Sequence, residues 1–253
     1  MILPIWTAKD QENQNQMLSD VIVRIKEKTD KQISTVAIFD LDGTLFDNRP
    51  RTVFILREIA ENFEEDLPEL SEAMENYKDI STVEYSLENT LKNMHVTDKK
   101  EVEFIKKEWE KRFFSDEYQK YDIPLPGART YVSKVYQAGA TVIYLTGRDA
   151  GRMLVGMTES LRLFGFPIGI VGTMTIVKKV FEESDEVFKS EVVSYLKRIG
   201  HVEAIFENEP INSNILHKSF PEATSFLALT QHREDAPQLN EGIHLIKNFK
   251  IRK

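Results

Sequence analysis

Short apolar runs alternate with helical patterns through most of this chain of 253 residues, and this alternation constrains the fold more than any other feature. The runs are rich in β-branched residues and lie at residues 35–40, 141–145, 203–206 and, more weakly, 225–229. Runs that are apolar at every position are typical of strands buried on both faces of a parallel sheet. The sequence therefore predicts several buried parallel strands.

Helical patterns separate these runs, at residues 130–137, 152–164 and 187–199. A glycine follows each of them at or near the position where helices commonly end. A further helix is expected over residues 11–30, where apolar residues recur every four positions. Strands and helices in this order predict an α/β fold with a Rossmann-like, doubly wound parallel sheet.

Residues 47–124 interrupt the alternation, because they are charged, helix-periodic and contain no strand-like run. We interpret them as a helical module inserted into an α/β core formed by residues 1–46 and 125–253. The alternative is that these helices belong to the core, but so long a helical block would be unusual for a simple crossover. The last segment, residues 231–253, has an apolar pattern that predicts a closing turn and helix.

Composition excludes several classes of protein. The net charge of −8 argues against a general nucleic-acid binder, which needs a basic surface. With no cysteine there is no disulfide, thiolate zinc site or cysteine nucleophile, and the five histidines are scattered. No apolar run approaches the roughly 18 residues that span a bilayer, and residues 1–6 lack the basic start of a secretion signal. We expect a cytoplasmic protein that binds neither nucleic acid nor membrane; its oligomeric state stays open.

Two aspartates follow the first apolar run, in Asp40-Leu41-Asp42-Gly43-Thr44. Residues i and i+2 of an extended chain point to the same side, so both carboxylates can meet at one spot. Gly43 permits a sharp turn that brings backbone amides near an anion. The simpler interpretation is a strand that ends in a common Asp-Gly turn.

A second polar group follows the next run, in Thr146-Gly147-Arg148. At the start of a helix, the Thr146 hydroxyl and the Gly147 amide would suit a phosphoryl oxygen. Thr146 could also be an ordinary helix N-cap. Its place at the carboxyl edge of the predicted sheet, where such folds bind ligands, favours the phosphate interpretation.

The Asp-x-Asp-Gly-Thr motif behind an apolar strand resembles the first motif of the haloacid dehalogenase-like hydrolase superfamily, and Thr146 is similar to its second. The resemblance implies that Asp40 is the nucleophile that takes up a phosphoryl group and that Asp42 is the general acid and base. It also implies Mg²⁺ bound by Asp40 and by the main-chain carbonyl of Asp42. A carboxylate attacking a charged phosphate needs such a cation and a proton donor for the leaving oxygen.

The family's third motif is a lysine ahead of the next strand, and Lys189 fits this place best, with Lys178 and Lys179 as rivals. The fourth motif usually carries acidic pairs that complete the Mg²⁺ shell. Here the chain departs from the family pattern, because Glu207 and Asn208 follow the strand. We predict Glu207 and Asn208 as metal ligands, with Asn212 possible, and the departure puts metal affinity and turnover in doubt.

Arginines near the motifs could contact substrate. Arg49 and Arg51 follow the first motif, and Arg148 follows Thr146. Arginine holds phosphate with two parallel hydrogen bonds, although a solvated surface arginine is the commoner outcome.

The resemblance implies a Mg²⁺-dependent phosphomonoester hydrolase with a helical cap at residues 47–124, acting on a small phosphorylated metabolite through an aspartyl phosphate. A dehalogenase is disfavoured because attack on carbon has no use for Asp42, and a phosphonatase would need a cap lysine that nothing marks out. The alternative from another class is a binding or regulatory protein that keeps the fold while the altered fourth motif leaves it weak or silent.

Overall fold

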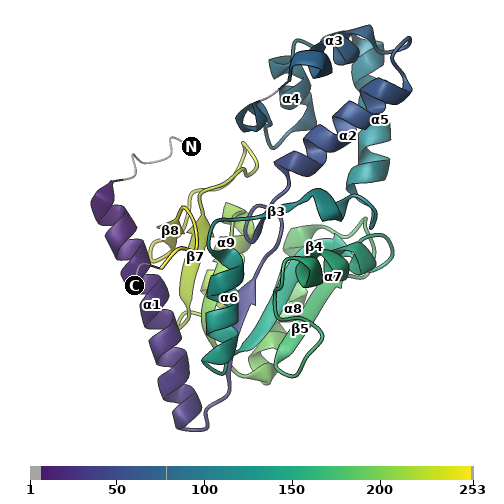
Figure 1. Cartoon of the computed structure of the whole chain (residues 1–253). Coiled ribbons are helices and arrows are strands. Elements are labelled where there is room, and N and C mark those ends of the chain that lie inside the picture. Colours follow the sequence, from purple (N-terminus) through teal and green to yellow (C-terminus); the bar gives the residue numbers. More distant parts are fainter. Residues whose placement is uncertain (1–6, 78, 252–253) are drawn as a thin grey trace. The chain divides into compact units, whose positions relative to one another are not determined.

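The structure is a computed structural model and describes residues 7–77 and 79–251. Its centre is a six-stranded sheet in the order β5-β4-β1-β6-β7-β8, in which every pairing is parallel (Figure 1). The strands are β1 (Thr35–Phe39), β4 (Thr141–Asp149), β5 (Thr173–Lys178), β6 (His201–Glu207), β7 (Thr224–Ala228) and β8 (His244–Ile246). The predicted α/β class with a parallel sheet is confirmed.

Helices cover both faces of this sheet, because both faces of the central strands are apolar. They are α1 (Ala8–Asp30), α6 (Ala128–Gln137), α8 (Asp185–Ile199) and α9 (Pro210–Ser219). A further helix, α7 (Leu154–Leu163), is divided between the two units of the chain. In β1, Val36 and Ile38 pack with residues of α8 and α9. Phe39 points the other way, where its ring meets that of Tyr131 in α6. Alternate side chains of β1 therefore pack against helices on opposite faces of the sheet, as in a doubly wound fold.

One irregularity in β6 joins α1 to the sheet. Val36 pairs with Val202 but Ala37 pairs with Ala204, so Glu203 is an extra, bulged residue. Its carboxylate accepts hydrogen bonds from Arg24 and Lys28 of α1, at 2.5 Å each. Glu203 is buried, and this double pairing offsets the cost of removing its charge from water.

Two strands differ from the sequence predictions. β5 was not predicted, because it is an edge strand whose residues are mostly half-exposed and not uniformly apolar. The predicted C-terminal helix is wrong, since the chain after Gly242 forms β8 and then an extended tail in which Phe249 is buried. The apolar residues that suggested a helix instead complete the end of the sheet.

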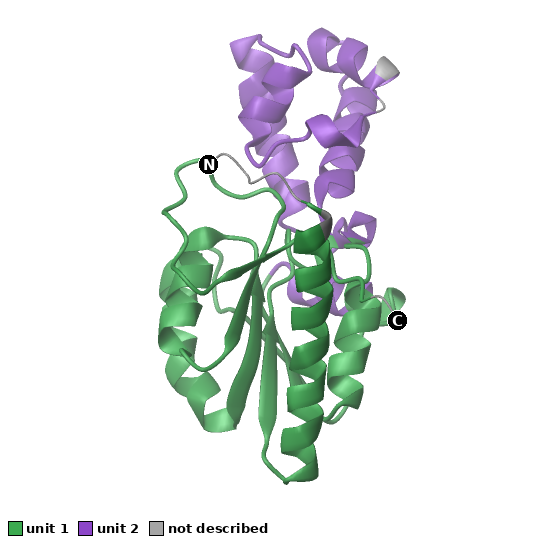
Figure 2. Ribbon diagram, turned by 90° about the vertical axis from the view of Figure 1, so that its left-hand side faces the viewer, with its two compact units in different colours: residues 1–46, 124–151, 161–253 green, residues 47–123, 152–160 purple. Residues whose placement is uncertain are grey.

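The chain divides into two compact units (Figure 2). The first contains the sheet and comprises residues 1–46, 124–151 and 161–253, of which residues 1–6 and 252–253 lie outside the described part of the chain. The second comprises residues 47–123 and 152–160, so it takes in part of a helix that the sequence analysis assigned to the core. The short strands β2 (Phe46–Asp47) and β3 (Ile123–Pro124) form a separate two-stranded sheet.

The second unit is helical and has a hydrophobic core of its own. Its elements are α2 (Arg49–Asn62), α3 (Pro68–Asn76), α4 (Leu87–Asn93), α5 (Lys99–Phe113) and the short 3₁₀ helices η1 (Ile80–Thr82) and η2 (Gln119–Tyr121). Fully buried Leu56, Leu70, Leu91 and Ile105 hold these helices together. Among the described residues, no helix combines the length and the apolar character needed to cross a bilayer.

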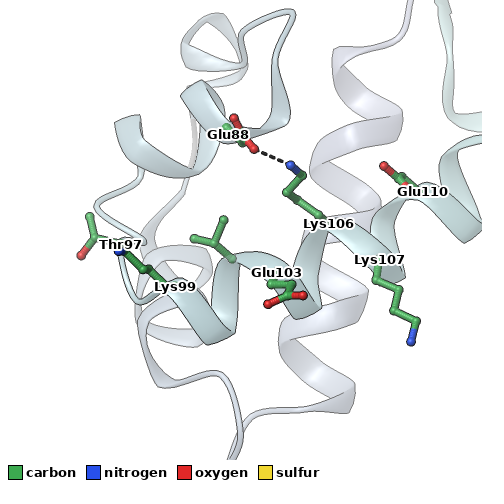
Figure 3. A pocket seen from close by; sticks show the side chains of 8 residues that line it. Glu88, Thr97, Lys99, Glu103, Lys106, Lys107 and Glu110 are labelled. Carbon is green, nitrogen blue, oxygen red and sulfur yellow. Dashed lines mark hydrogen bonds and ion pairs between the residues drawn. The ribbon is translucent and has the colours of Figure 1, made fainter.

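An open groove of about 440 Å³ lies within this helical unit (Figure 3). Positively charged lysines and negatively charged glutamates line it, and Lys106 forms an ion pair with Glu88. The lining residues are Glu88, Thr97, Lys99, Val102, Glu103, Lys106, Lys107 and Glu110. None of them is a predicted site residue, and their mixed charge is typical of a solvated surface.

The bulged Glu203 generates a prediction about acid stability. Its charged partners lower its pKa below the ordinary 4.5, so it stabilises the fold at neutral pH and loses this effect as pH falls through the lowered pKa. Glu203→Gln should cost about 2 kcal/mol of the free energy of unfolding at pH 7. The cost should shrink as the pH falls below 4.5, as measured by urea denaturation.

Glu222→Gln is the matched control, because the Glu222 side chain is 83% exposed and should change stability little at any pH. A cost for Glu203→Gln that does not depend on pH would contradict the prediction.

Candidate active site

Three of the predicted side chains meet in the buried space between β1, β6 and α8. Asp40 is the first residue after β1, and its amide donates to the Phe206 carbonyl, so it continues the ladder toward β6. The Lys189 ammonium donates to Asp40 Oδ1 at 3.0 Å and to Glu207 Oε2 at 2.5 Å. Asp40 is 6% exposed, and Lys189 and Glu207 are each 1% exposed. One cation therefore serves two buried carboxylates.

Burial and the charge of Glu207 raise the pKa of Asp40 to about 8, against the opposing effect of Lys189. Burial alone would lower the pKa of Lys189, but the charges of Asp40 and Glu207 outweigh it and raise the pKa, so the ammonium stays charged. A further positive charge beside Asp40 would lower the pKa of Asp40 and favour the ionised nucleophile.

The turn after Asp42 depends on glycine. Gly43 has φ of +73°, and a Cβ there would lie 2.2 Å from Nδ2 of Asn208. The amide of Asn208 therefore lies against the turn, and its Oδ1 accepts a hydrogen bond from Thr44 at 3.3 Å. Thr230 at the end of β7 donates to the Gly43 carbonyl at 2.5 Å. This packing holds the first motif beside the end of β6.

Asp42 forms an ion pair that the sequence did not predict. The Arg148 guanidinium holds both of its oxygens, with Nε to Oδ2 at 2.8 Å and Nη2 to Oδ1 at 2.9 Å. The signal available in the sequence was the place of Arg148 two residues after Thr146, at the same sheet edge as Asp42. Sequence analysis considered only a contact between Arg148 and substrate.

Thr146 lies at the carboxyl edge of the sheet, and no helix begins directly after it. β4 continues to Asp149 and α7 begins at Leu154, close to the expected start at residue 152, so Thr146 is not a helix N-cap. Thr146 Oγ1 accepts a hydrogen bond from the Arg148 amide at 3.3 Å. A Cβ on Gly147 would lie 2.2 Å from the carboxylate of Asp185 in α8, so glycine leaves room for that side chain. Contact of Thr146 or Gly147 with a phosphoryl group stays a prediction.

Glu207 uses both of its oxygens within the protein. Oε2 accepts from Lys189, and Oε1 accepts from the amides of Asn208 and Glu209 at 3.1 Å each. Its role as a metal ligand stays a prediction, and the structure shows it as an anchor for the ammonium. The buried Oδ1 of Asn212, in contrast, accepts no hydrogen bond from any described residue.

The remaining candidates are held by local partners. Arg49 pairs with Asp47, and the buried Arg51 lies 2.9 Å from Asp122 and stacks over the ring of Phe113, all within the helical unit. Of the rival lysines, Lys178 donates to the carbonyls of Phe181 and Glu183, and Lys179 is exposed. Only Lys189 of the three lysines reaches Asp40.

Comparison with known proteins now decides the family. The model of the haloacid dehalogenase-like hydrolase family matches residues 35–170, which is more than half of the chain. The chain belongs to this hydrolase family. The resemblance that the first motif suggested is thereby confirmed, and the match begins at β1, directly before Asp40. No curated protein matches the sequence.

Solved structures are similar to this chain at low sequence identity. A putative phosphatase from Clostridium difficile aligns with 13% identity and a TM-score of 0.54, covering 81% of this chain and 89% of its own. A putative β-phosphoglucomutase from Thermotoga maritima has 19% identity and a TM-score of 0.45, covering 86% and 95%. A class C acid phosphatase from Bacillus anthracis, solved with tungstate bound, has 12% identity and a TM-score of 0.42, covering 81% of this chain and 66% of its own.

The shared cation generates a prediction about stability. Lys189→Met removes the charge that Asp40 and Glu207 have in common and leaves two buried carboxylates without it. We expect the free energy of unfolding to fall by about 3 kcal/mol or more, measured by urea denaturation in the presence of chelator.

Lys197→Met on the same helix is the control, because Lys197 is exposed and should cost little. Equal effects of the two substitutions would show that the buried ammonium is not needed for folding.

Proposed function

We propose that this hydrolase is a Mg²⁺-dependent phosphomonoester hydrolase that acts on a small phosphorylated metabolite through an aspartyl phosphate. The observation that carries the proposal is the buried contact between Lys189 and Asp40, in the family's first motif at the carboxyl edge of the sheet. A lysine that touches a nucleophilic carboxylate can offset the negative charge that gathers when a phosphoryl group arrives.

The side chains divide the proposed reaction between them. An oxygen of Asp40 attacks phosphorus, the bond from phosphorus to the leaving oxygen breaks, and Asp42 donates a proton to that oxygen. Water then attacks the phosphorus of the aspartyl phosphate while Asp42 takes its proton, which releases inorganic phosphate and restores Asp40. Thr146 and the Gly147 amide are proposed to hold phosphoryl oxygens. Lys189 keeps its charge throughout.

The donor set fits a hard divalent cation. Among residues 7–77 and 79–251, no three or more Asp, Glu and His side chains gather as a metal site. Mg²⁺ needs few carboxylates, however, and usually keeps several waters. Asp40, the Asp42 carbonyl and Asn208 would supply oxygens, and the buried Oδ1 of Asn212 is an acceptor in need of a partner. When bound, the ion would neutralise negative charge on the phosphoryl group.

The helical unit is proposed as the cap. It has its own hydrophobic core, and in this family such caps exclude water from the leaving-group pocket and usually accompany small substrates. Cytoplasmic location belongs to the same proposal and follows from the composition of the chain. The second candidate is a binding protein with weak or no catalytic activity. The pairing of Glu207 with Lys189 supports this candidate, because the predicted metal donors that remain in the fourth motif, Asn208 and Asn212, are side-chain amides rather than carboxylates.

The first test is turnover of an aryl phosphate with Mg²⁺ and with chelator. We expect metal-dependent hydrolysis, and a loss of at least about 1,000-fold in Asp40→Asn, because the amide cannot act as the nucleophile. Asp30→Asn, an exposed aspartate at the end of α1, should retain full activity. Activity that persists in Asp40→Asn would refute the proposed nucleophile.

The second test measures Mg²⁺ binding by calorimetry, without substrate. We expect sub-millimolar affinity. Asn212→Ala should weaken it roughly tenfold, because the substitution removes the buried oxygen that is proposed to support the metal site. Asn214→Ala on the same helix is the control, because its amide already donates to the Gln238 carbonyl. No Mg²⁺ binding in the unaltered protein would favour the silent alternative.

A further inference from the structure

The pair between Arg148 and Asp42 has the geometry of a tight, two-pronged contact. Two nitrogens of one guanidinium face two oxygens of one carboxylate, at 2.8 and 2.9 Å. The Arg148 side chain is 1% exposed, so the positive charge is fixed in place by its surroundings. The Asp42 side chain is 32% exposed, so the carboxylate lies on the open side of the pair. Such forks are stronger and more directional than single contacts.

This arrangement disfavours the proton transfers that the proposed function assigns to Asp42, because the positive charge of Arg148 favours the ionised carboxylate. A guanidinium has five donors and no acceptor, and it stays charged. Both Asp42 oxygens therefore accept from Arg148. The carboxylate in this pair is the proton-free form, which cannot donate a proton to a leaving oxygen.

A phosphoryl group offers the fork an equivalent partner. Its oxygens have the spacing that guanidinium binds with two parallel hydrogen bonds. Arg148 follows Thr146 by two residues, and Asp42 follows Asp40 by two, so the fork is close in the chain to both parts of the proposed phosphate site. The other cation, Lys189, is already shared between Asp40 and Glu207.

We propose that the phosphoryl group of the substrate takes Arg148 from Asp42, and that this exchange releases Asp42 for proton transfer. The inference rests on the proposed phosphatase function and adds to it a substrate-binding residue that controls Asp42. Arg148 thereby links occupation of the site to the readiness of its acid and base. Without substrate, Asp42 stays paired. The exchange also lowers the observed affinity for phosphate, because the fork must leave one anion to bind another.

The test is a double-mutant cycle of phosphate binding, with inorganic phosphate as the probe at a fixed Mg²⁺ concentration. Calorimetry, with phosphorus NMR for weak binders, gives Kd for the unaltered protein, Asp42→Asn, Arg148→Gln and the double variant. We expect Asp42→Asn to bind about 10-fold more tightly, because the competitor for the fork is gone. Arg148→Gln should bind roughly 10- to 100-fold more weakly.

The double variant separates exchange from simple repulsion. If Asp42 competes for Arg148, the gain from Asp42→Asn disappears in the Arg148→Gln background. If Asp42 only repels phosphate by its charge, the gain persists in that background and the proposal is overturned. Unchanged or weaker binding by Asp42→Asn also overturns it.

Two controls keep the result interpretable. Arg198→Gln removes an equal charge from the exposed far end of α8 and should leave Kd unchanged. If Arg148→Gln fails to fold, Arg148→Lys replaces it, and the gain from Asp42→Asn should fall below about 3-fold because an ammonium cannot hold both oxygens. Failure of the proposed function would show separately, as absent Asp40-dependent turnover.

Discussion

The buried ammonium of Lys189 is the interaction on which the proposed site depends. Two carboxyl groups, those of Asp40 and Glu207, lie almost completely out of water, and without a positive partner burial would disfavour their charged forms still more strongly. Lys189 reaches both from α8 and so joins the ends of β1 and β6 through one charge. The amides of Asn208 and Glu209 hold the other oxygen of Glu207 and thereby fix the start of α9. A single cation organises the edge of the sheet where the first and fourth motifs meet.

The sequence predicted the parts of the fold that depend on local pattern. Uniformly apolar runs identified β1, β4, β6 and β7, since strands buried on both faces leave that signature. It could not predict the bulge at Glu203, because the extra residue exists only relative to the partner strand β1. β5 and β8 were missed for a related reason. Each is an edge strand that pairs with only one neighbour. β5 is mostly half-exposed, and the apolar residues around β8 suggested a helix, so pairing rather than composition makes each a strand.

At the candidate site, the sequence likewise indicated which residues take part but not how their side chains are oriented. Spacing within the chain was enough to bring Asp40 and Asp42 together, although proposing Lys189 needed the resemblance to the family. It could not tell that the oxygens of Glu207 face an ammonium and two amides, because the orientation of a side chain depends on contacts from other elements. Nor could it tell that Arg51 is buried against Asp122 in the helical unit, since a lone arginine after a motif has no sequence signal of burial.

The charged pairs of the candidate residues divide between the two units. The ion pairs of Asp40 and Asp42 lie within the unit that contains the sheet, whereas those of Arg49 and Arg51 lie within the helical unit. Each unit also buries its own apolar side chains. Substitutions in the core of the helical unit therefore need not disturb the pairing of Lys189 or Arg148. Under the proposed function, such an arrangement would let the helical unit change which substrate it admits while the other unit keeps the same reacting groups, as in folds that serve many substrates.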